Sequence, residues 1–204
     1  MAKIKLTKGE LKRQRDALAQ YQRYLPTLQL KKQQLQLEIL QQDNLLIDRE
    51  SSLAKKKEQA KVWAGLLSGP VDVRPWIKPA RIISGTKNVA GVDMAIFERV
   101  EFAAAECDLF ITPLWVDFAI EALHSLVSLK NEIMLIKEGI AVLKHELRIT
   151  TQRVNLFEKV KIPETEEAIR LIKVYIGDQM ANAVGRSKIA KRKIEEAVFA
   201  GALA

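Results

Sequence analysis

The sequence is poor in residues that make loops and covalent cross-links. It has a single cysteine, Cys107, so it can form no internal disulfide bond, which fits a reducing compartment. Only 9 of its 204 residues are glycine, and this composition favours helices over loops. No apolar run is long enough to span a bilayer, and the N-terminus lacks the apolar region of a signal peptide. We therefore expect a soluble, mainly helical protein.

The patterns that mark catalytic and cofactor sites are also missing. There is no glycine-rich phosphate loop, and Cys107 has no cysteine or histidine at zinc-ligand spacing. His124 and His145 lie roughly 30 Å apart along one predicted helix, too far to share a metal, so we interpret both as plain surface side chains. No pair of carboxylates suggests an acid and a base in a cleft. We predict no catalytic residue, no metal site, no cofactor and no enzymatic activity of the chain by itself.

What the sequence contains instead is heptad periodicity. Between residues 126 and 163, apolar residues recur at alternating spacings of three and four, and Thr150 fills the one polar position. These residues are Leu126, Leu129, Ile133, Ile136, Ile140, Leu143, Leu147, Val154 and Phe157. Because a lone helix would leave this stripe in water, the pattern predicts a partner helix.

Residues 7–66 supply that partner. Thr7 and Glu10 have the spacing of a capping box, in which each side chain bonds the backbone of the other residue. A second heptad pattern follows, and Gly69-Pro70 ends it. Pro26 lies inside the pattern and predicts a kink. The apolar positions include Leu11, Leu18, Tyr21, Leu25, Leu28, Leu35, Ile39, Leu46 and Leu53.

The segment between the two predicted helices differs from them in composition. Prolines and glycines break residues 67–112 into short pieces, of which 82–92 and 95–102 read as two strands of a hairpin. Thr112-Pro113 suits the start of a second helix over 113–204, kinked near Pro163 but not ended there. The predicted fold is mostly α: a long antiparallel two-helix coiled coil, with a small insert containing a β-hairpin and an overhanging C-terminal helix.

Charges beside the apolar positions suggest a register for the two helices. We predict that Ile39 faces Ile136, because this places Asp43 near Lys137. A slide of one heptad in either direction keeps the apolar positions matched but brings Glu38 beside another glutamate. Since each exposed ion pair contributes only about 0.3–0.5 kcal/mol, charge separates these registers weakly.

Two apolar surfaces remain without a partner in this register. Thr7 lies opposite Ala168, so the helix beyond Ala168 overhangs and exposes a stripe of Ile169, Ile172, Ile176 and Met180. The first helix also has a row on its outer face, made of Leu30, Leu37, Leu40 and Ile47. Three interpretations stay open for this row: the insert covers it, it is scattered surface leucine without a role, or it docks a second protein.

The net charge of +8 is compatible with nucleic acid, an anionic membrane face or an acidic protein partner. Basic residues gather near the C-terminus, at Arg186, Lys188, Lys191, Arg192 and Lys193. Aromatic residues do not alternate with them, which favours a solvated or acid-facing helix over a nucleic-acid site.

One segment has a specific likeness to a known family. Residues 148–158 read Arg-Ile-Thr-Thr-Gln-Arg-Val-Asn-Leu-Phe-Glu, and Ile162-Pro163 follows. This segment resembles the C-terminal helix motif of the D subunits of V-type and A-type rotary ATPases. The N-terminal segment 6–11 and the insert segment 88–92 are also similar to that family. Leu6, Gln152 and Pro26 depart from its pattern.

The resemblance implies a central rotor shaft that transmits torque between a catalytic head and a membrane ion-translocating rotor. It implies three kinds of partner: catalytic and non-catalytic head subunits, the small F subunit of the central stalk, and a funnel subunit above the membrane rotor. It also implies a cytoplasmic location at the membrane periphery, without nucleic acid or membrane insertion. Thr7, Arg153, Asn155 and Pro163 are the expected contact or shaping residues. The alternatives are a coiled-coil scaffold or tether with no rotary role, and a basic helical nucleic-acid binder.

Overall fold

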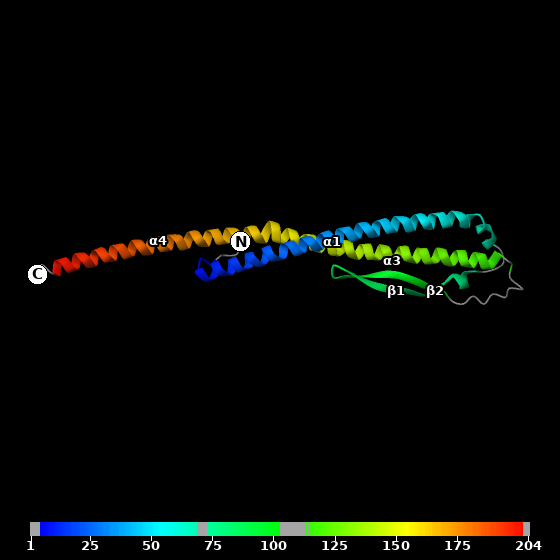
Figure 1. The fold of residues 1–204 in the computed structure, drawn as a ribbon, viewed down its shortest axis with the longest axis horizontal. Helices are drawn as coiled ribbons and strands as arrows, with labels where there is room; N and C mark the ends of the chain where they lie inside the picture. Colours follow the sequence, from blue (N-terminus) through cyan, green and yellow to red (C-terminus); the bar gives the residue numbers. More distant parts are fainter. Residues whose placement is uncertain (1–4, 69–72, 103–112, 114, 202–204) are drawn as a thin grey trace. The chain divides into compact units, whose positions relative to one another are not determined.

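The computed structural model describes residues 5–68, 73–102, 113 and 115–201 (Figure 1). The predictions made for Gly69-Pro70, Cys107 and Thr112 lie outside these residues. The elements are α1 (Lys8–Lys61), the 3₁₀ turn η1 (Ala64–Ser68), α2 (Arg74–Ile77), β1 (Pro79–Val89), β2 (Val92–Phe102), α3 (Trp115–Leu156), the π-helical turn η2 (Phe157–Lys161) and α4 (Ile162–Gly201). The predicted fold class, with long helices on both sides of a β-hairpin, is confirmed.

The chain forms two compact units, which are described separately. Unit 1 comprises Met1–Gln29 and Gln152–Ala204, and unit 2 comprises Leu30–Thr151. Unit 2 contains the hairpin and the helical segments that pack with it, and unit 1 contains the first turns of α1 together with η2 and α4.

Half of the predicted capping box is present at the start of α1. The Glu10 backbone N–H donates to Thr7 Oγ1 at 3.3 Å, so Thr7 caps the helix. The Thr7 backbone N–H donates to the Lys5 carbonyl instead of to Glu10. The Glu10 carboxylate accepts from Gln14 Nε2 at 2.7 Å. The reciprocal bond from Thr7 to Glu10 was therefore predicted wrongly, because a partner one turn later on the helix competes for the carboxylate.

The two long helices of unit 2 pair antiparallel, but one heptad away from the predicted register. Lys144 Nζ lies 3.6 Å from Asp43 Oδ1, and Lys137 Nζ lies 2.7 Å from Glu50 Oε1. The predicted register paired Asp43 with Lys137, so each acid has moved to the next lysine along α3. The same shift places Leu143, not Ile136, in one buried cluster with Ile39.

The reason for the shift lies in the insert. The observed register is one that the sequence disfavoured, because it brings Glu38 beside a second glutamate. Lys87 of β1 resolves this conflict: its Nζ donates to Glu38 Oε1 at 2.9 Å. The same oxygen accepts from Gln42 Nε2 at 2.9 Å. Lys87, which is 49 residues away in sequence, therefore gives Glu38 a positively charged partner in the register that the helix charges disfavoured.

The hairpin itself is longer than predicted, and its turn explains its geometry. Ala90 and Gly91 both have positive φ, +51° and +79°, as a two-residue type I′ turn requires. The Gly91 N–H donates to Asn88 Oδ1 at 3.0 Å, and Asn88 Nδ2 donates to Asp93 Oδ1 at 2.6 Å. β1 and β2 then pair antiparallel from Val89 opposite Val92 onwards.

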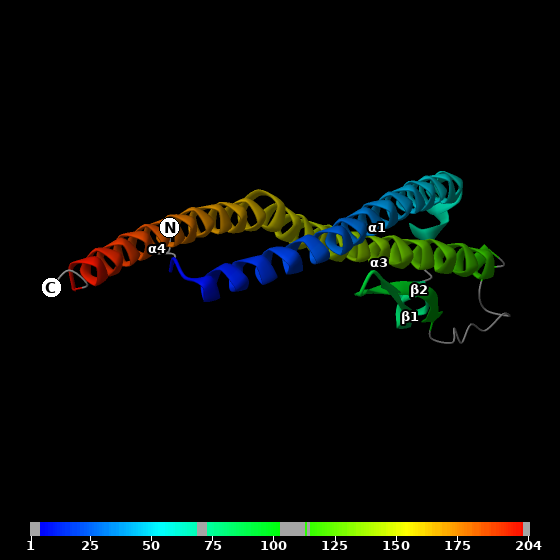
Figure 2. The same ribbon diagram turned by 60° about the vertical axis from the view of Figure 1, so that its left-hand side comes forward.

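Two buried clusters fix the insert in unit 2, where Figures 1 and 2 show the strands alongside α3. The first joins Leu35 and Ile39 of α1, Val92 and Met94 of β2, and Leu143 of α3. The second joins Val73 with Val116 and Ile120 near the start of α3. Each cluster removes apolar surface of the insert and of the helices from water together.

His124 is not the plain surface residue that we predicted. Its Nε2 lies 2.7 Å from the Trp76 carbonyl oxygen, to which a protonated ring nitrogen donates. Its ring stacks on Phe102 with centroids 3.8 Å apart and planes 10° apart. The histidine therefore ties α3 to α2, which precedes the hairpin, and to the last residue of β2. Sequence spacing placed it outside the heptad stripe but could not show that the insert packs there.

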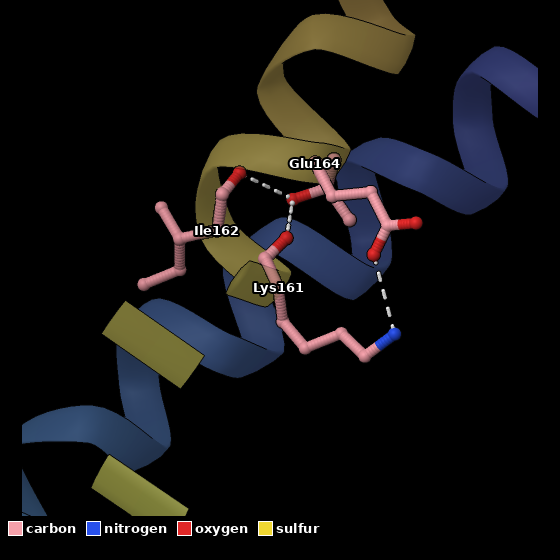
Figure 3. A network of polar contacts seen from close by, with 4 residues as sticks. Lys161, Ile162 and Glu164 are labelled. Carbon is pink, nitrogen blue, oxygen red and sulfur yellow. Dashed lines mark hydrogen bonds and ion pairs between the residues drawn. The ribbon is translucent and has the colours of Figure 1, made fainter. Parts of the chain in front are cut away.

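In unit 1, the helical path continues through Pro163, as predicted. Proline has no N–H, so a regular helix would lose one backbone bond there. The π-helical turn η2 comes directly before it, and the Ile162 N–H bonds to the Phe157 carbonyl, five residues back. Thr165 Oγ1 lies 2.8 Å from the Lys161 carbonyl and 2.9 Å from that of Ile162, and Figure 3 shows this network. A buried hydroxyl thus shares its one proton between two carbonyl oxygens where the helix departs from regular geometry.

The uncovered part of the second helix begins further along the chain than we predicted. Ala168, Ile169 and Ile172 are buried, and Ile176 is half-buried. Tyr21 of α1 stacks on Phe157 with ring centroids 5.3 Å apart, which shows that α1 covers this part of unit 1. Within unit 1, the buried face therefore extends along the second helix at least to Ile172, beyond the predicted end of the pairing at Ala168.

Candidate functional site

The outer row of α1 lies on an uncovered face of unit 2. Its four side chains, those of Leu30, Leu37, Leu40 and Ile47, are each between 58% and 62% exposed. The hairpin packs instead against Leu35 and Ile39 of the same helix. The interpretation in which the insert covers the row is therefore wrong. The heptad positions explain the geometry, since residues on opposite sides of a helix cannot both face the insert.

The second half of α4 is exposed almost everywhere. From Gly177 to Val198 every position except Gly185 is exposed. Met180, Val184, Ile189, Ile194 and Val198 are large apolar residues, and each is more than half exposed. Met180 extends the face that buries Ile169 and Ile172, whereas Ile189 projects from another side of the helix. Apolar residues on more than one side suit a partner that surrounds the helix.

The remaining predicted site residues divide into exposed and structural positions. Arg153 and Asn155 are exposed on the last turns of α3. Thr7 caps α1, and Pro163 follows the π-helical turn, so both shape the helices of unit 1. Ile169 and Ile172 lie in the core instead of on a free surface.

Sequence reasoning missed two strongly exposed apolar residues in unit 2. Val62 follows the end of α1 and is 90% exposed, and Phe118 lies in the first turn of α3 and is 77% exposed. Both lie outside the heptad stripes. That signal was available, because a large apolar residue off the stripe has no predicted partner.

Charge in unit 2 is arranged in pairs across elements. Besides the two lysine pairs on α3, Arg49 Nε lies 2.8 Å from Glu132 Oε1. Burial by itself would raise the pKa of Glu38, but the hydrogen bonds from Lys87 and Gln42 and the Lys87 charge together hold that pKa below its ordinary value. Glu167 in unit 1 also has a lowered pKa, because Arg170 donates hydrogen bonds to it on the exposed face of α4.

Within the described part of the chain, no three metal-binding side chains gather into a cluster. None of the described helices combines the length and the apolar composition needed to cross a bilayer.

Two uncovered apolar surfaces on long helices are typical of a helical protein that works inside a larger assembly. Comparison with known proteins identifies the family. The sequence model of the ATP synthase D subunit matches residues 10–192. The D subunit of the V-type ATP synthase of Borreliella burgdorferi is 44% identical over 194 residues, covering 95% of this chain and 96% of the relative. That of Chlamydia pneumoniae is 35% identical over 195 residues, covering 94% and 93%.

The chain belongs to the family of ATP synthase D subunits. These proteins are central-stalk components of rotary ATP synthases, so membership supports the predicted rotary role and not a general coiled-coil scaffold. It also makes the chain part of a multi-subunit, membrane-associated complex.

Proposed function

We propose that this chain is the non-catalytic central shaft of its complex and carries torque between the ATP-hydrolysing head and the ion-translocating rotor in the membrane. Segments 7–66 and 113–204 form the shaft, and segment 67–112 forms an insert that braces it. The shaft works on the cytoplasmic side of the membrane. Paired helices suit this role, because their backbone hydrogen bonds run along the axis and the apolar stripe between them resists separation.

The observation that carries the proposal is the exposed second half of α4. Catalytic and non-catalytic head subunits surround the helix from Ile176 onwards and cover Met180. Ile169 and Ile172 are excluded from this contact, since they already lie in the core of unit 1. An isolated helix with Gly177 and Gly185 inside it is marginal in water, because each glycine costs about 1 kcal/mol relative to alanine. A surrounding partner would supply the missing stabilisation.

Truncation after Ile176 tests this contact. Because that cut keeps the buried residues of α4, we expect the shortened chain to retain its helix pairing. In the reconstituted complex it should bind the head more weakly, or ATP hydrolysis should proceed without rotation. Unchanged affinity and full coupling would overturn the assignment. Met180→Asp should reproduce part of the loss, whereas Gln179→Asp, which adds the same charge at a position that is already polar, should cost less.

The outer row of α1 is the proposed dock for the small F subunit of the central stalk. Leu37→Asp combined with Leu40→Asp should weaken that complex at least tenfold, because two charges enter an apolar interface. Helicity should stay near normal, since both side chains are exposed. The control is Gln20→Asp with Gln22→Asp, which adds equal charge at exposed positions of the same helix, at least eight residues before the row begins. Equal binding by both double variants would contradict the dock.

The proposed contact with the funnel subunit involves Val62 and Phe118. Their exposure is unusual for large apolar residues of a protein surface, and the α1 and α3 ends that carry them enclose one groove lined by Trp63 and Leu126. Phe118→Ser should lower affinity for the funnel subunit and spare the complex with the small F subunit, measured by pull-down of each purified partner. Loss of both complexes would indicate unfolding instead. Arg153 and Asn155 are proposed as polar contacts of the shaft.

A further inference from the structure

The apolar stripes of α1 and α3 accept more than one register. Asp43 and Glu50 are spaced by seven residues, and so are Lys130, Lys137 and Lys144. A slide of one heptad, about 10 Å along the axis, moves each acid from one lysine to the next and re-forms these two pairs, but it separates Arg49 from Glu132, whose side chains lie 2.8 Å apart in the observed register. The apolar positions also repeat every seven residues, so they match again. Neither the lysine pairs nor the apolar positions therefore distinguish the registers, and among the ion pairs named here between the two helices the Arg49–Glu132 pair favours the observed one.

Polar positions within the stripes add a weak preference. Heptad spacing places Lys32 opposite Thr150 in the observed register and opposite Leu143 after the slide. Thr150 is buried, so its hydroxyl matters to the packing. A lysine, however, can lay its methylene chain along apolar surface and keep its ammonium group in water. This mismatch is therefore tolerable.

The hairpin contacts both helices at points that are specific to one register. Val92 and Met94 lie in one cluster with Ile39 and Leu143. Lys87 on the same hairpin donates to Glu38 of α1 at 2.9 Å. Together these contacts hold the strands at fixed positions along α1 and along α3.

Gly139 makes the hairpin contact with α3 selective. A Cβ atom at this position would lie 3.3 Å from the Met94 terminal methyl, so the hairpin approaches α3 closely at a glycine. The residues seven before and seven after it are Glu132 and Glu146. A slide in either direction would therefore press a glutamate side chain against the methyl of Met94. Burying an unpaired carboxylate against apolar atoms is unfavourable, so the packed hairpin excludes both slid registers.

We propose that the β-hairpin is a register clamp, which holds α1 and α3 in one of the registers that their stripes accept. Release of the hairpin allows α3 to slide by one heptad against α1 in unit 2. The clamp consists of Lys87 on Glu38 and of Met94 on Gly139, with Leu143 behind it. It does not depend on which proteins bind the outer surfaces.

Two cysteine pairs outside the clamp measure the register in the full-length chain carrying Cys107→Ser. Leu46→Cys with Ile136→Cys reports the observed register, and Leu46→Cys with Leu129→Cys reports the slid one, because facing stripe positions approach within disulfide range. With an intact hairpin, the first pair should oxidise at least tenfold faster than the second. In the release variant, Lys87→Met with Met94→Ala, the ratio of the two rates should fall at least tenfold.

Arg99→Met is the matched control, because Arg99 pairs with Glu101 of its own strand and not with a helix. It should leave the ratio unchanged. A release variant that keeps its helicity and the original ratio would overturn the clamp. If the release variant loses helicity, the charge test decides. Lys87→Glu alone should lower the ratio, because it sets two carboxylates against each other, and adding Glu38→Lys should restore it. Equal ratios for the single and the swapped variant would also overturn the proposal.

Discussion

Leu143 is the side chain on which the packing of unit 2 depends most directly. It is fully buried, with 0% exposure, and lies in one cluster with residues of α1 and of the hairpin. Leu143→Ala would remove its three outermost carbon atoms from a site bordered by three elements. Core leucine-to-alanine changes cost about 2–5 kcal/mol, and the cost rises where the surroundings cannot collapse into the cavity. The hairpin and both helices hold this site open, so we expect a loss of about 3–4 kcal/mol.

Urea unfolding followed by circular dichroism measures that loss. Leu40→Ala is the matched control, because it makes the same chemical change at a side chain that is 59% exposed, and we expect it to cost less than about 0.5 kcal/mol. Hydrogen exchange gives a second measurement: amide protons of β2 should exchange faster in Leu143→Ala, since Val92 and Met94 lose a packing partner. Equal midpoints for the two variants, or unchanged exchange in β2, would refute this account of the core.

Four further predictions concern single contacts. Because the folded-state pKa of Glu38 lies below its unfolded value, its contribution to stability is present above the unfolded pKa and is lost as pH falls through the folded one; Glu38→Gln should flatten the pH dependence of the urea midpoint over that window, and an unchanged slope would contradict the pairing with Lys87. Ala90→Asn should stabilise the hairpin by about 0.5–1 kcal/mol, since asparagine tolerates the positive φ better than alanine, whereas Ala95→Gly in β2 should destabilise it. His124→Ala should cost about 1–2 kcal/mol by removing the stack on Phe102 and the bond to Trp76, and should speed proteolysis of the insert, while His145→Ala, at an exposed position, should do neither. Thr165→Val should cost about 1–2 kcal/mol because carbonyl oxygens beside the π-helical turn lose their donor; Thr165→Ser, which keeps the hydroxyl, should lie closer to the original stability, and equal losses would rule out the hydroxyl as the cause.

Periodicity along the sequence was sufficient to predict the two long helices and the hairpin between them. Each of these features depends on residues that are close in the chain: heptad spacing within a helix, a capping residue such as Thr7, and the turn residues next to Gly91. The stretch around Arg153 and Pro163 was also enough to suggest the family, because it requires only neighbouring residues in a fixed order.

The register and the free surfaces depended on the tertiary structure. Apolar positions that repeat every seven residues face each other again after a slide of seven. The sequence pattern therefore could not distinguish Ile136 from Leu143 as the partner of Ile39. The contacts that we propose as the register clamp, Lys87 on Glu38 and Met94 on Gly139, join residues that are far apart in sequence. The exposed part of α4 begins later than predicted, because Ile169 and Ile172 are buried in unit 1. The sequence therefore determined which elements form, whereas contacts between distant residues decided how the paired helices align.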